Sequence, residues 1–449
     1  MFEPIYTADE MRAAEAGHDE AELMECAGRG VAELILREYA DAGRITVVCG
    51  PGNNGGDGRI AARVLREASK DVLVVESRPD DEEKELGEPD LIVDALFGTG
   101  FTGEPRPSAA RLIERMNESG AEIVAVDIAS GVDASTGEVA SAAVEAWSTI
   151  ALHGAKVGSL VAPGRFVSGA LNVVDIGLEP RETAHALVTG EIVDLVPLRE
   201  DRDTKYTAGS VLLVGGSRGM SGAAALAARA AFRADAGYVA VAAPEETLSV
   251  LEALIVEAVK RPLGEVWDAV RRAGALGIGP GLGRAPEAIE LVRRLLAETD
   301  VPAVVDADAL HGLEPFARDA PTVLTPHSGE LGRLLDEESS WVDAHRLEAL
   351  DRAVERFACV VLLKGSETLV GAPGERVLLA DSSAALATAG TGDVLTGVIA
   401  AFLAKGMEPR LAAAAGAFVH GRAPLEAPME AGLMAGDVAD AIPYVLDDD

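Results

Sequence analysis

The sequence predicts an α/β protein whose first half forms a doubly wound parallel sheet and whose second half forms a second, larger α/β layer domain. Short β-branched runs alternate with helical patterns over residues 45–128, and a second alternation begins after residue 209. The length of 449 residues corresponds to two or three domains of ordinary size. We therefore expect one α/β domain over residues 1–195 and a larger one over 196–449.

The first half contains four clear strand patterns. Helical patterns over residues 8–40 precede them, and turn-rich residues 178–209 follow further strand-like pieces that extend to about residue 177. The expected strands are 45–49, 71–76, 91–97 and 123–128, and the expected helices between them include 59–69 and 107–119.

The second half repeats the alternation with longer Ala-rich helices. An expected helix at 221–236 follows the strand-like "SVLLVGG", and a long helical region covers about 391–425. The remaining strand-like runs are "YVAVAAP", "ALGIGPG", "PAVVDADAL", "TVLTP" and "VVLLKG".

The composition is strongly acidic. There are 74 acidic against 39 basic residues, and only seven of the bases are lysine. A net charge of −35 disfavours binding to nucleic acid or anionic membranes. We interpret it as a solvated surface adapted to high salt, with an acidic docking surface for a partner as the alternative.

Several function classes are disfavoured by simple patterns. No run reaches the roughly 18 apolar residues of a membrane span, and the N-terminus lacks the apolar core of a signal peptide. The three cysteines are scattered, without zinc spacing, and fit a reducing cytoplasm. We expect a cytoplasmic enzyme that acts on small molecules. We also expect it to form a homo-oligomer.

Three polar, glycine-containing clusters follow strands in the first half: "GPGNNGGDG" (50–58), "VDALFGTGFTGE" (93–104) and "VDIASGVD" (126–133). Ligands bind at the carboxyl ends of parallel strands. Glycines let backbone N–H groups approach an anion, and Asn, Asp and Ser supply oxygen ligands for a cation. The clusters therefore indicate a phosphorylated ligand beside a cation or a proton-transfer group. The alternative is three tight turns.

These clusters, with "LMECAGRGVAELI" before them, resemble the NAD(P)H-hydrate epimerase family over roughly residues 5–180. The resemblance implies a Rossmann-like fold that interconverts the R and S forms of NAD(P)H hydrated at nicotinamide C6. It also implies a potassium ion on Asn54, Asp94 and Ser130, and a catalytic, substrate-contacting Asp127 near the nicotinamide. The other implied substrate-binding residues are Asn53, Asn54, Gly55, Gly56, Asp57, Gly98, Thr99, Gly100, Phe101, Thr102, Gly103 and Glu104. Cys26 replaces the family's asparagine, and we expect it to be buried and inert.

The clearest feature of the second half is "TAGTGDVLTGVIAAFLAKG" (388–406). A Gly-Thr-Gly-Asp turn leads into an apolar helix, whose first N–H groups can stabilise phosphoryl oxygens. Asp393 can accept a proton from a substrate hydroxyl, which predicts phosphoryl transfer to an alcohol. The alternative for Asp393 is simple helix capping. His327 and Lys364 follow two further strand patterns, and a glycine turn lies at 277–283.

Together these motifs resemble the ADP/ATP-dependent NAD(P)H-hydrate dehydratase family over roughly residues 200–445. The resemblance implies a ribokinase-like fold that phosphorylates the C6 hydroxyl of the S form, after which phosphate leaves. ADP with Mg²⁺ is the implied phosphoryl donor. Asp393 is the implied catalytic base. Ala223, Gly281, His327 and Asp393 are implied to contact the substrate, and Lys364, Gly365, Ser366, Glu367, Thr368 and Gly392 the nucleotide.

Two alternatives to a bifunctional repair enzyme remain at the level of sequence. One is a ribokinase-type small-molecule kinase fused to a nucleotide-binding domain, which the "GTGD" motif alone permits. The other is a non-catalytic sensor of cofactor state. The retention of Asp127 and Asp393 disfavours the sensor.

Overall fold

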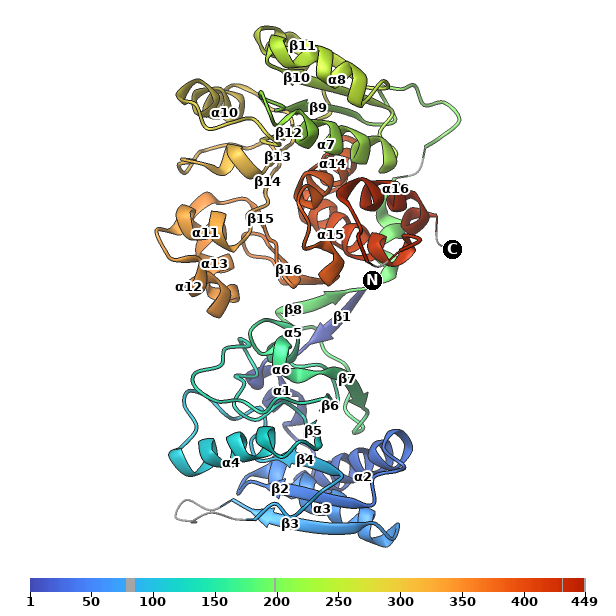
Figure 1. Ribbon diagram of the computed structural model, residues 1–449, viewed down its shortest axis with the longest axis vertical. Helices are drawn as coiled ribbons and strands as arrows, with labels where there is room; N and C mark the ends of the chain where they lie inside the picture. The colour runs from blue at the N-terminus through green and yellow to red at the C-terminus, as the bar shows by residue number, and fades with distance from the viewer. Residues whose placement is uncertain (78–84, 198, 430, 448–449) are drawn as a thin grey trace. The chain divides into compact units, whose positions relative to one another are not determined.

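Parallel strands form most of both sheets in the computed structural model, which describes residues 1–77, 85–197, 199–429 and 431–447. The chain divides into two compact units (Figure 1). The N-terminal unit comprises residues 4–185 and 343–346, and the C-terminal unit comprises residues 1–3, 186–342 and 347–449. The division falls at 185/186, before the expected 195/196, because Ala186, Val188 and Ile192 belong to the core of the C-terminal unit.

The N-terminal unit contains a sheet with the strand order β3-β2-β4-β5-β6-β7, and each neighbouring pair is parallel. Its strands are β2 (Arg44–Cys49), β3 (Asp71–Glu76), β4 (Leu91–Ala95), β5 (Glu122–Val126), β6 (Ser148–Leu152) and β7 (Ala170–Val174). Its helices are α1 (Ala8–Glu15), α2 (Glu20–Glu38), α3 (Asn53–Glu67), α4 (Pro107–Glu118), α5 (Val157–Leu160) and α6 (Arg165–Ser168). α2 and α3 pack on one face of the sheet and α4 packs on the other.

The glycine-rich segment after β2 differs from the expected loop. We expected a turn up to Gly58 and a helix from 59, but α3 begins at Asn53, directly after Gly52. The glycines permit this early start because they pack against the protein itself. A Cβ added at Gly55 would lie 1.9 Å from the Gly50 carbonyl oxygen. A Cβ added at Gly58 would lie 2.5 Å from the Ala95 side chain. Close packing therefore outweighs the low helix propensity of glycine.

The C-terminal unit contains the larger sheet, whose strand order is β1-β8-β17-β16-β15-β14-β13-β12-β9-β10-β11. From β15 to β11 the neighbours are parallel, whereas β16 is antiparallel to β15 and β17. The strands are β1 (Phe2–Ile5), β8 (His185–Val188), β9 (Ser210–Val214), β10 (Tyr238–Ala243), β11 (Val259–Pro262), β12 (Ala275–Ile278), β13 (Ala303–Val305), β14 (Thr322–Leu324), β15 (Val360–Leu363), β16 (Glu367–Gly371) and β17 (Val377–Asp381).

Helices cover both faces of this sheet (Figure 1). One layer holds α7 (Ser221–Arg233), α14 (Thr391–Ala404), α15 (Pro409–Glu426) and α16 (Ala435–Leu446). The other holds α10 (Pro286–Glu298), α11 (Ser328–Leu335), α12 (Ser339–Ala344) and α13 (Arg346–Phe357). Both α8 (Leu248–Leu254) and α9 (Val266–Val270) contact β11. The expected helical region 391–425 is two helices, because Gly406 takes a left-handed φ of 89° and Pro409 starts α15.

The cysteines differ from expectation at one position. Cys26 is exposed, which contradicts its expected burial. The buried face of α2 is formed by Ala27, Val31 and Ile35 among others, and Cys26 lies outside it.

Among the described residues, no helix has both the length and the apolar character needed to cross a membrane.

Candidate functional site

Two groups of polar residues lie at the carboxyl ends of strands, one in each unit. In the N-terminal unit, the first group joins α3 to the ends of β4 and β5. The Ser130 backbone N–H donates to Asp94 Oδ2 at 2.9 Å, and Ser130 Oγ donates to Asp94 Oδ1 at 2.7 Å. Asn54 Nδ2 donates to the Phe97 carbonyl at 2.7 Å, and the Phe97 N–H donates to Ser130 Oγ at 2.8 Å. The three predicted cation ligands therefore share one hydrogen-bonded network.

This network fits a hard cation. Asn54 Oδ1 is a buried acceptor without a hydrogen-bond partner among the described residues, and such an oxygen costs about 1–3 kcal/mol when left unsatisfied. Asp94 is fully buried, and burial raises its pKa to about 6, although hydrogen bonds from Ser130 oppose the shift. A bound cation would satisfy the amide oxygen and favour the ionised form of Asp94.

Asp127 lies in a strained turn directly after β5. Its φ of 70° is uncommon for a residue with a side chain, and such strain concentrates at functional sites. Asp127 Oδ1 forms an ion pair with Lys156 Nζ and accepts the Leu152 N–H at 3.2 Å. Lys156 is fully buried, and its Nζ also donates to the carbonyls of Leu152 at 2.6 Å and Gly154 at 3.0 Å. These contacts fix the Asp127 carboxylate.

Two further carboxyl groups lie near this pair. Asp57 is buried in α3, and burial, with Asp127 and Glu15 nearby, raises its pKa to about 8. Burial and Asp127 also raise the pKa of Glu15. A cavity of about 360 Å³ opens beside them. It is lined by Arg12, Glu15, Ala16, His18, Glu20, Leu23, Met24, Ala27, Asn53, Asp57, Leu152 and Ile176.

The other predicted substrate-binding residues of this unit lie around the same strand ends. Asn53 lines the cavity and donates from Nδ2 to Glu20 at 2.8 Å. The segment 98–104 forms the turn between β4 and α4, where the Phe101 ring stacks on Phe97 with centroids 4.7 Å apart. Gly98 packs against Asn54, because an added Cβ would lie 3.1 Å from the Asn54 Cβ.

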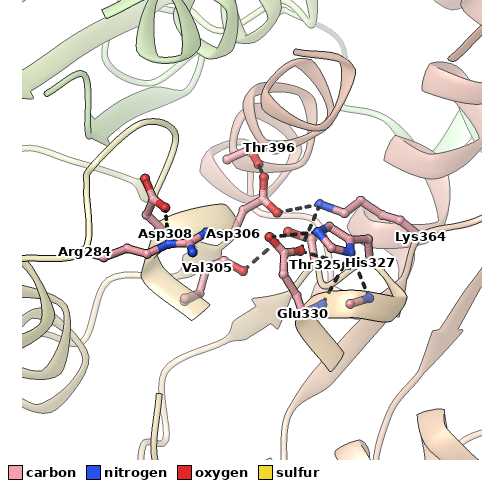
Figure 2. Close-up of polar contacts among 10 residues, drawn as sticks. Arg284, Val305, Asp306, Asp308, Thr325, His327, Glu330, Lys364 and Thr396 are labelled. Atoms are coloured by element: carbon pink, nitrogen blue, oxygen red, sulfur yellow. Dashed lines mark hydrogen bonds and ion pairs between the residues drawn. The ribbon is translucent and has the colours of Figure 1, made fainter. Parts of the chain in front are cut away.

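In the C-terminal unit, Asp306 holds the centre of the second group (Figure 2). It follows β13, is 1% exposed, and accepts from Lys364 Nζ at 2.7 Å and from Thr396 Oγ1 at 2.8 Å. Burial alone would lower the pKa of Lys364, but Asp306 and Glu330 raise it above its usual value. The charged Lys364 is thus anchored at the end of β15.

The predicted base Asp393 lies in the first turn of α14, which follows Gly390 with its left-handed φ of 96°. Burial, and then the charge of Asp306, raises the pKa of Asp393 to about 7. An added Cβ on Gly392 would lie 3.4 Å from Lys364 Nζ. The start of α14 therefore combines a carboxyl group, a nearby ammonium group and first-turn N–H groups that a helix leaves without internal acceptors.

His327 caps the start of α11 (Figure 2). Its Nδ1 accepts from the N–H groups of Gly329 at 3.0 Å and Glu330 at 3.4 Å, and Glu330 accepts the His327 N–H at 3.0 Å. Burial lowers the pKa of His327, which favours the neutral ring. Because Nδ1 is occupied as an acceptor, the neutral ring presents Nε2–H as a donor.

The predicted contact residues Ala223 and Gly281 lie together. An added Cβ on Gly281, whose φ is 60°, would lie 3.2 Å from the Ala223 Cβ. Beside them, Asp308 accepts the Gly283 N–H at 2.9 Å and pairs with Arg284 Nε at 2.8 Å (Figure 2).

The predicted nucleotide-binding run 364–368 is a short turn that leads into β16. Glu367 and Thr368 are buried in this strand, and Glu367 accepts from Ser366 Oγ at 2.6 Å. Within this run, the Lys364 side chain lies beside Gly392 and Asp306.

Sequence reasoning assigned no role to several residues of these groups. Lys156 and Glu15 were missed in the N-terminal unit, and Asp306 and Thr396 in the C-terminal unit. The scarcity of lysine could have indicated Lys156, and "VVDADAL" after a strand pattern could have indicated Asp306.

Comparison with known proteins covers both units. The family model described as NAD(P)H-hydrate dehydratase matches residues 211–444, and the one described as YjeF-related protein N-terminus matches residues 20–87 and 73–158. The chain is 37% identical to the bifunctional NAD(P)H-hydrate repair enzyme Nnr of Moorella thermoacetica, over 94% of this chain and 92% of the relative. It is 36% identical to the repair enzyme Nnr of Salinibacter ruber, over 94% of this chain and 91% of that relative.

Solved structures match the C-terminal unit. One is the ADP/ATP-dependent NAD(P)H-hydrate dehydratase of Bacillus subtilis, co-crystallised with ATP/Mg²⁺, which is 29% identical in sequence. The two structures match with a TM-score of 0.53 over 57% of this chain and 96% of the Bacillus chain. A ribokinase-like superfamily protein of Enterococcus faecalis, 24% identical with a TM-score of 0.53 over 60% of this chain and 97% of its own, shares the fold. The predicted fold class of two α/β domains, the second ribokinase-like, is confirmed.

Proposed function

The chain belongs to the family of bifunctional NAD(P)H-hydrate repair enzymes. From this premise we propose that each of its two units catalyses one of the two reactions. The N-terminal unit interconverts the R and S forms of hydrated NAD(P)H. The C-terminal unit dehydrates the S form to NAD(P)H, with ADP as phosphoryl donor and AMP and phosphate as products. The match to dehydratases across residues 211–444 favours this function over a kinase for another alcohol.

One observation carries the dehydratase proposal: Asp393, Lys364 and the first turn of α14 meet at one point. A base with a pKa of about 7 is suited to take the proton of the C6 hydroxyl near neutral pH. The Lys364 ammonium and the first-turn N–H groups would stabilise charge on the transferred phosphoryl group. Phosphate then leaves far more readily than hydroxide would.

The supporting residues have distinct roles in this proposal. Asp306 positions Lys364 and Thr396 by accepting a hydrogen bond from each side chain. His327 would donate from Nε2 to the hydrated cofactor, with Ala223 and Gly281 beside it, and 364–368 with Gly392 would hold the nucleotide. Mg²⁺ would accompany ADP and neutralise its phosphates, and the carboxylates beside Lys364 are of the oxygen type that this ion prefers.

For the epimerase, we propose that the cavity beside Asp57 and Asp127 holds the nicotinamide end of the substrate. The segments 53–57 and 98–104 would line the rest of the dinucleotide. Potassium would be held by Asn54, Asp94 and Ser130 and would contribute positive charge beside the substrate. The unpartnered Asn54 Oδ1 supports this assignment.

Three broader expectations accompany this function. The three free cysteines fit a reducing, cytoplasmic location. The acidic composition fits a salt-adapted protein. A homo-oligomer is consistent with a groove of about 690 Å³ between α7 and α8, where Leu254 and Val256 are 55% and 75% exposed.

Recovery of the dihydronicotinamide absorbance tests the proposal directly. Each purified epimer of hydrated NADH is incubated with the protein, ADP, Mg²⁺ and KCl. We expect recovery from both epimers, and recovery from S alone when the N-terminal unit is inactivated by Asp127→Asn. Absence of recovery from either epimer would overturn the proposal, whereas phosphorylation of sugar or vitamin alcohols would favour the kinase.

A further inference from the structure

Four charged residues gather at one end of the N-terminal unit's sheet. Glu15 ends α1, Asp57 lies in α3, Asp127 follows β5 and Lys156 precedes α5. Glu15 and Asp57 line the cavity, as does Leu152, whose N–H binds the Asp127 carboxylate. Three carboxyl groups therefore surround one ammonium group at a space large enough for a ligand.

The four groups are not equivalent. Lys156 forms its ion pair with Asp127, and its Nζ also donates to the carbonyls of Leu152 and Gly154. Asp57 is 7% exposed and has no ion pair of its own within the described part of the chain. Because Lys156 pairs directly with Asp127, and Asp57 has Asp127 and Glu15 as negative neighbours, the cluster favours a proton on Asp57.

We propose that Asp57 is the proton donor and Asp127 the proton acceptor of epimerisation, and that Lys156 is the positioning residue that holds the Asp127 side chain in place through their ion pair. This inference rests on the proposed epimerase function and adds an acid–base pair to it. The raised pKa of Asp57, about 8, is consistent with a carboxyl group that stays protonated at neutral pH.

The chemistry follows from the substrate, because C6 carries its hydroxyl beside the ring nitrogen N1. Asp57 donates its proton to that hydroxyl, the C6–O bond breaks, and its electron pair leaves with water. The N1 lone pair forms the C6=N1 bond. A water then adds its oxygen to the opposite face of C6, the electrons return to N1, and Asp127 takes the proton released by that water.

One water is released and one is consumed, so that the reaction needs no oxidant. The opposite epimer reacts by the reverse path, with Asp127 as donor and Asp57 as acceptor. Between turnovers in one direction, solvent at the open cavity returns the proton from Asp127 to Asp57.

The first test is Asp57→Asn, which retains the size of the side chain but removes its transferable proton. We expect the kcat of epimerisation to fall by about 10²–10⁴-fold with a smaller change in KM. Dehydration of the S form by the same polypeptide should remain at wild-type rate. Glu22→Gln, an exposed change in the first turn of α2, is the control and should leave both activities unchanged.

The second test uses the pH profile, which a merely structural role would not shift. Wild-type epimerisation should decline as pH rises through about 8, because Asp57 loses its proton. Glu15→Gln removes a charge that raises the pKa of Asp57, so that this decline should move to lower pH. Lys156→Met removes a charge that lowers it, and the decline should move to higher pH, with a lower maximal rate.

The outcomes separate the two levels of inference. Wild-type protein without epimerase activity would contradict the proposed function itself. An active wild type with an equally active Asp57→Asn variant would overturn the acid–base assignment alone. If Lys156→Met fails to fold, Glu15→Gln still decides the matter, since an unshifted profile in that variant contradicts the role of Asp57.

Discussion

At the scale of single residues, each unit places a lysine–aspartate pair beside its candidate site. Lys156 with Asp127 and Lys364 with Asp306 are largely buried, in a chain that has only seven lysines. Removing one partner from such a pair leaves an uncompensated charge in a poorly solvated place. Each pair therefore fixes an ammonium group beside a candidate site, in a chain whose bases are mostly arginine.

The base assignment predicts the behaviour of Asp393→Asn. Dehydration should fall by about 10²–10⁴-fold, because the amide cannot accept the proton, while epimerisation continues. In the wild type, dehydration should increase as pH rises through about 7, because the carboxylate is the active form. Both expectations are checked by measuring the rates of dehydration and epimerisation of the wild type and the variant as a function of pH. Loss of both activities in a folded variant would contradict two independent sites.

The positioning role of Asp306 predicts a stability effect. Asp306→Asn leaves the Lys364 ammonium without its main partner, and the C-terminal unit should lose about 3–5 kcal/mol of unfolding free energy. Denaturant unfolding measures the change, with Asp268→Asn as the control. Asp268 pairs with Arg271 at 3.7 Å and both are about 80% exposed, so that variant should change stability by less than about 0.5 kcal/mol. Equal effects would argue against the role.

At the scale of elements, both sites use the start of a helix that carries glycine in its first turn. α3 begins "NNGGDG" and α14 begins "TGD". The absence of side chains allows each helix to approach its neighbour closely: Gly58 of α3 opposes Ala95 of β4, and Gly397 of α14 opposes the Ala227 carbonyl of α7. The approach of α3 to the sheet places Asn54 and Asp57 beside the strand ends.

Close approach predicts that Gly58 does not tolerate even a methyl group. In Gly58→Ala the new Cβ would lie 2.5 Å from the Ala95 side chain, so that the N-terminal unit should lose about 1–3 kcal/mol of stability. Thermal unfolding of the variant measures this. Gly100→Ala, where no heavy atom lies within 4 Å of the new Cβ, provides the control. A fully stable Gly58→Ala variant would show that α3 can shift outward.

The sheets were predictable because buried parallel strands appear as continuous β-branched runs. β3 matches its expected range, 71–76, and β4 ends two residues before the expected 97. The start of α3 was not predictable, because glycine normally disfavours helix and the compensating contacts are distant in sequence. Lys156 was missed for the same reason, since its partner Asp127 lies 29 positions earlier and tertiary structure alone joins them.

At the scale of the whole molecule, the net charge of −35 opposes compactness. Most ion pairs of the described residues are exposed and contribute little individually. Self-repulsion is reduced by salt, because the screening length falls from about 10 Å at 0.1 M to about 3 Å at 1 M.

Screening predicts that the unfolding free energy rises with salt concentration. The increase should be the same for NaCl and KCl, because it depends on ionic strength. Epimerisation should instead respond to potassium specifically, if Asn54, Asp94 and Ser130 hold this ion. Unfolding and activity measured in both salts separate the two effects. Stability that is independent of salt would contradict adaptation of the surface to saline conditions.

The packed glycines of α3 also limit how this protein can evolve. A Cβ added at Gly55 or Gly58 would lie less than 3 Å from the Gly50 backbone or the Ala95 Cβ, which leaves these two positions few tolerated substitutions. The cavity rim is freer, because Arg12, His18 and Leu23 project from α1, the α1–α2 turn and α2. A laboratory selection for a different dinucleotide should therefore accumulate its changes at the rim and leave the glycine segment intact.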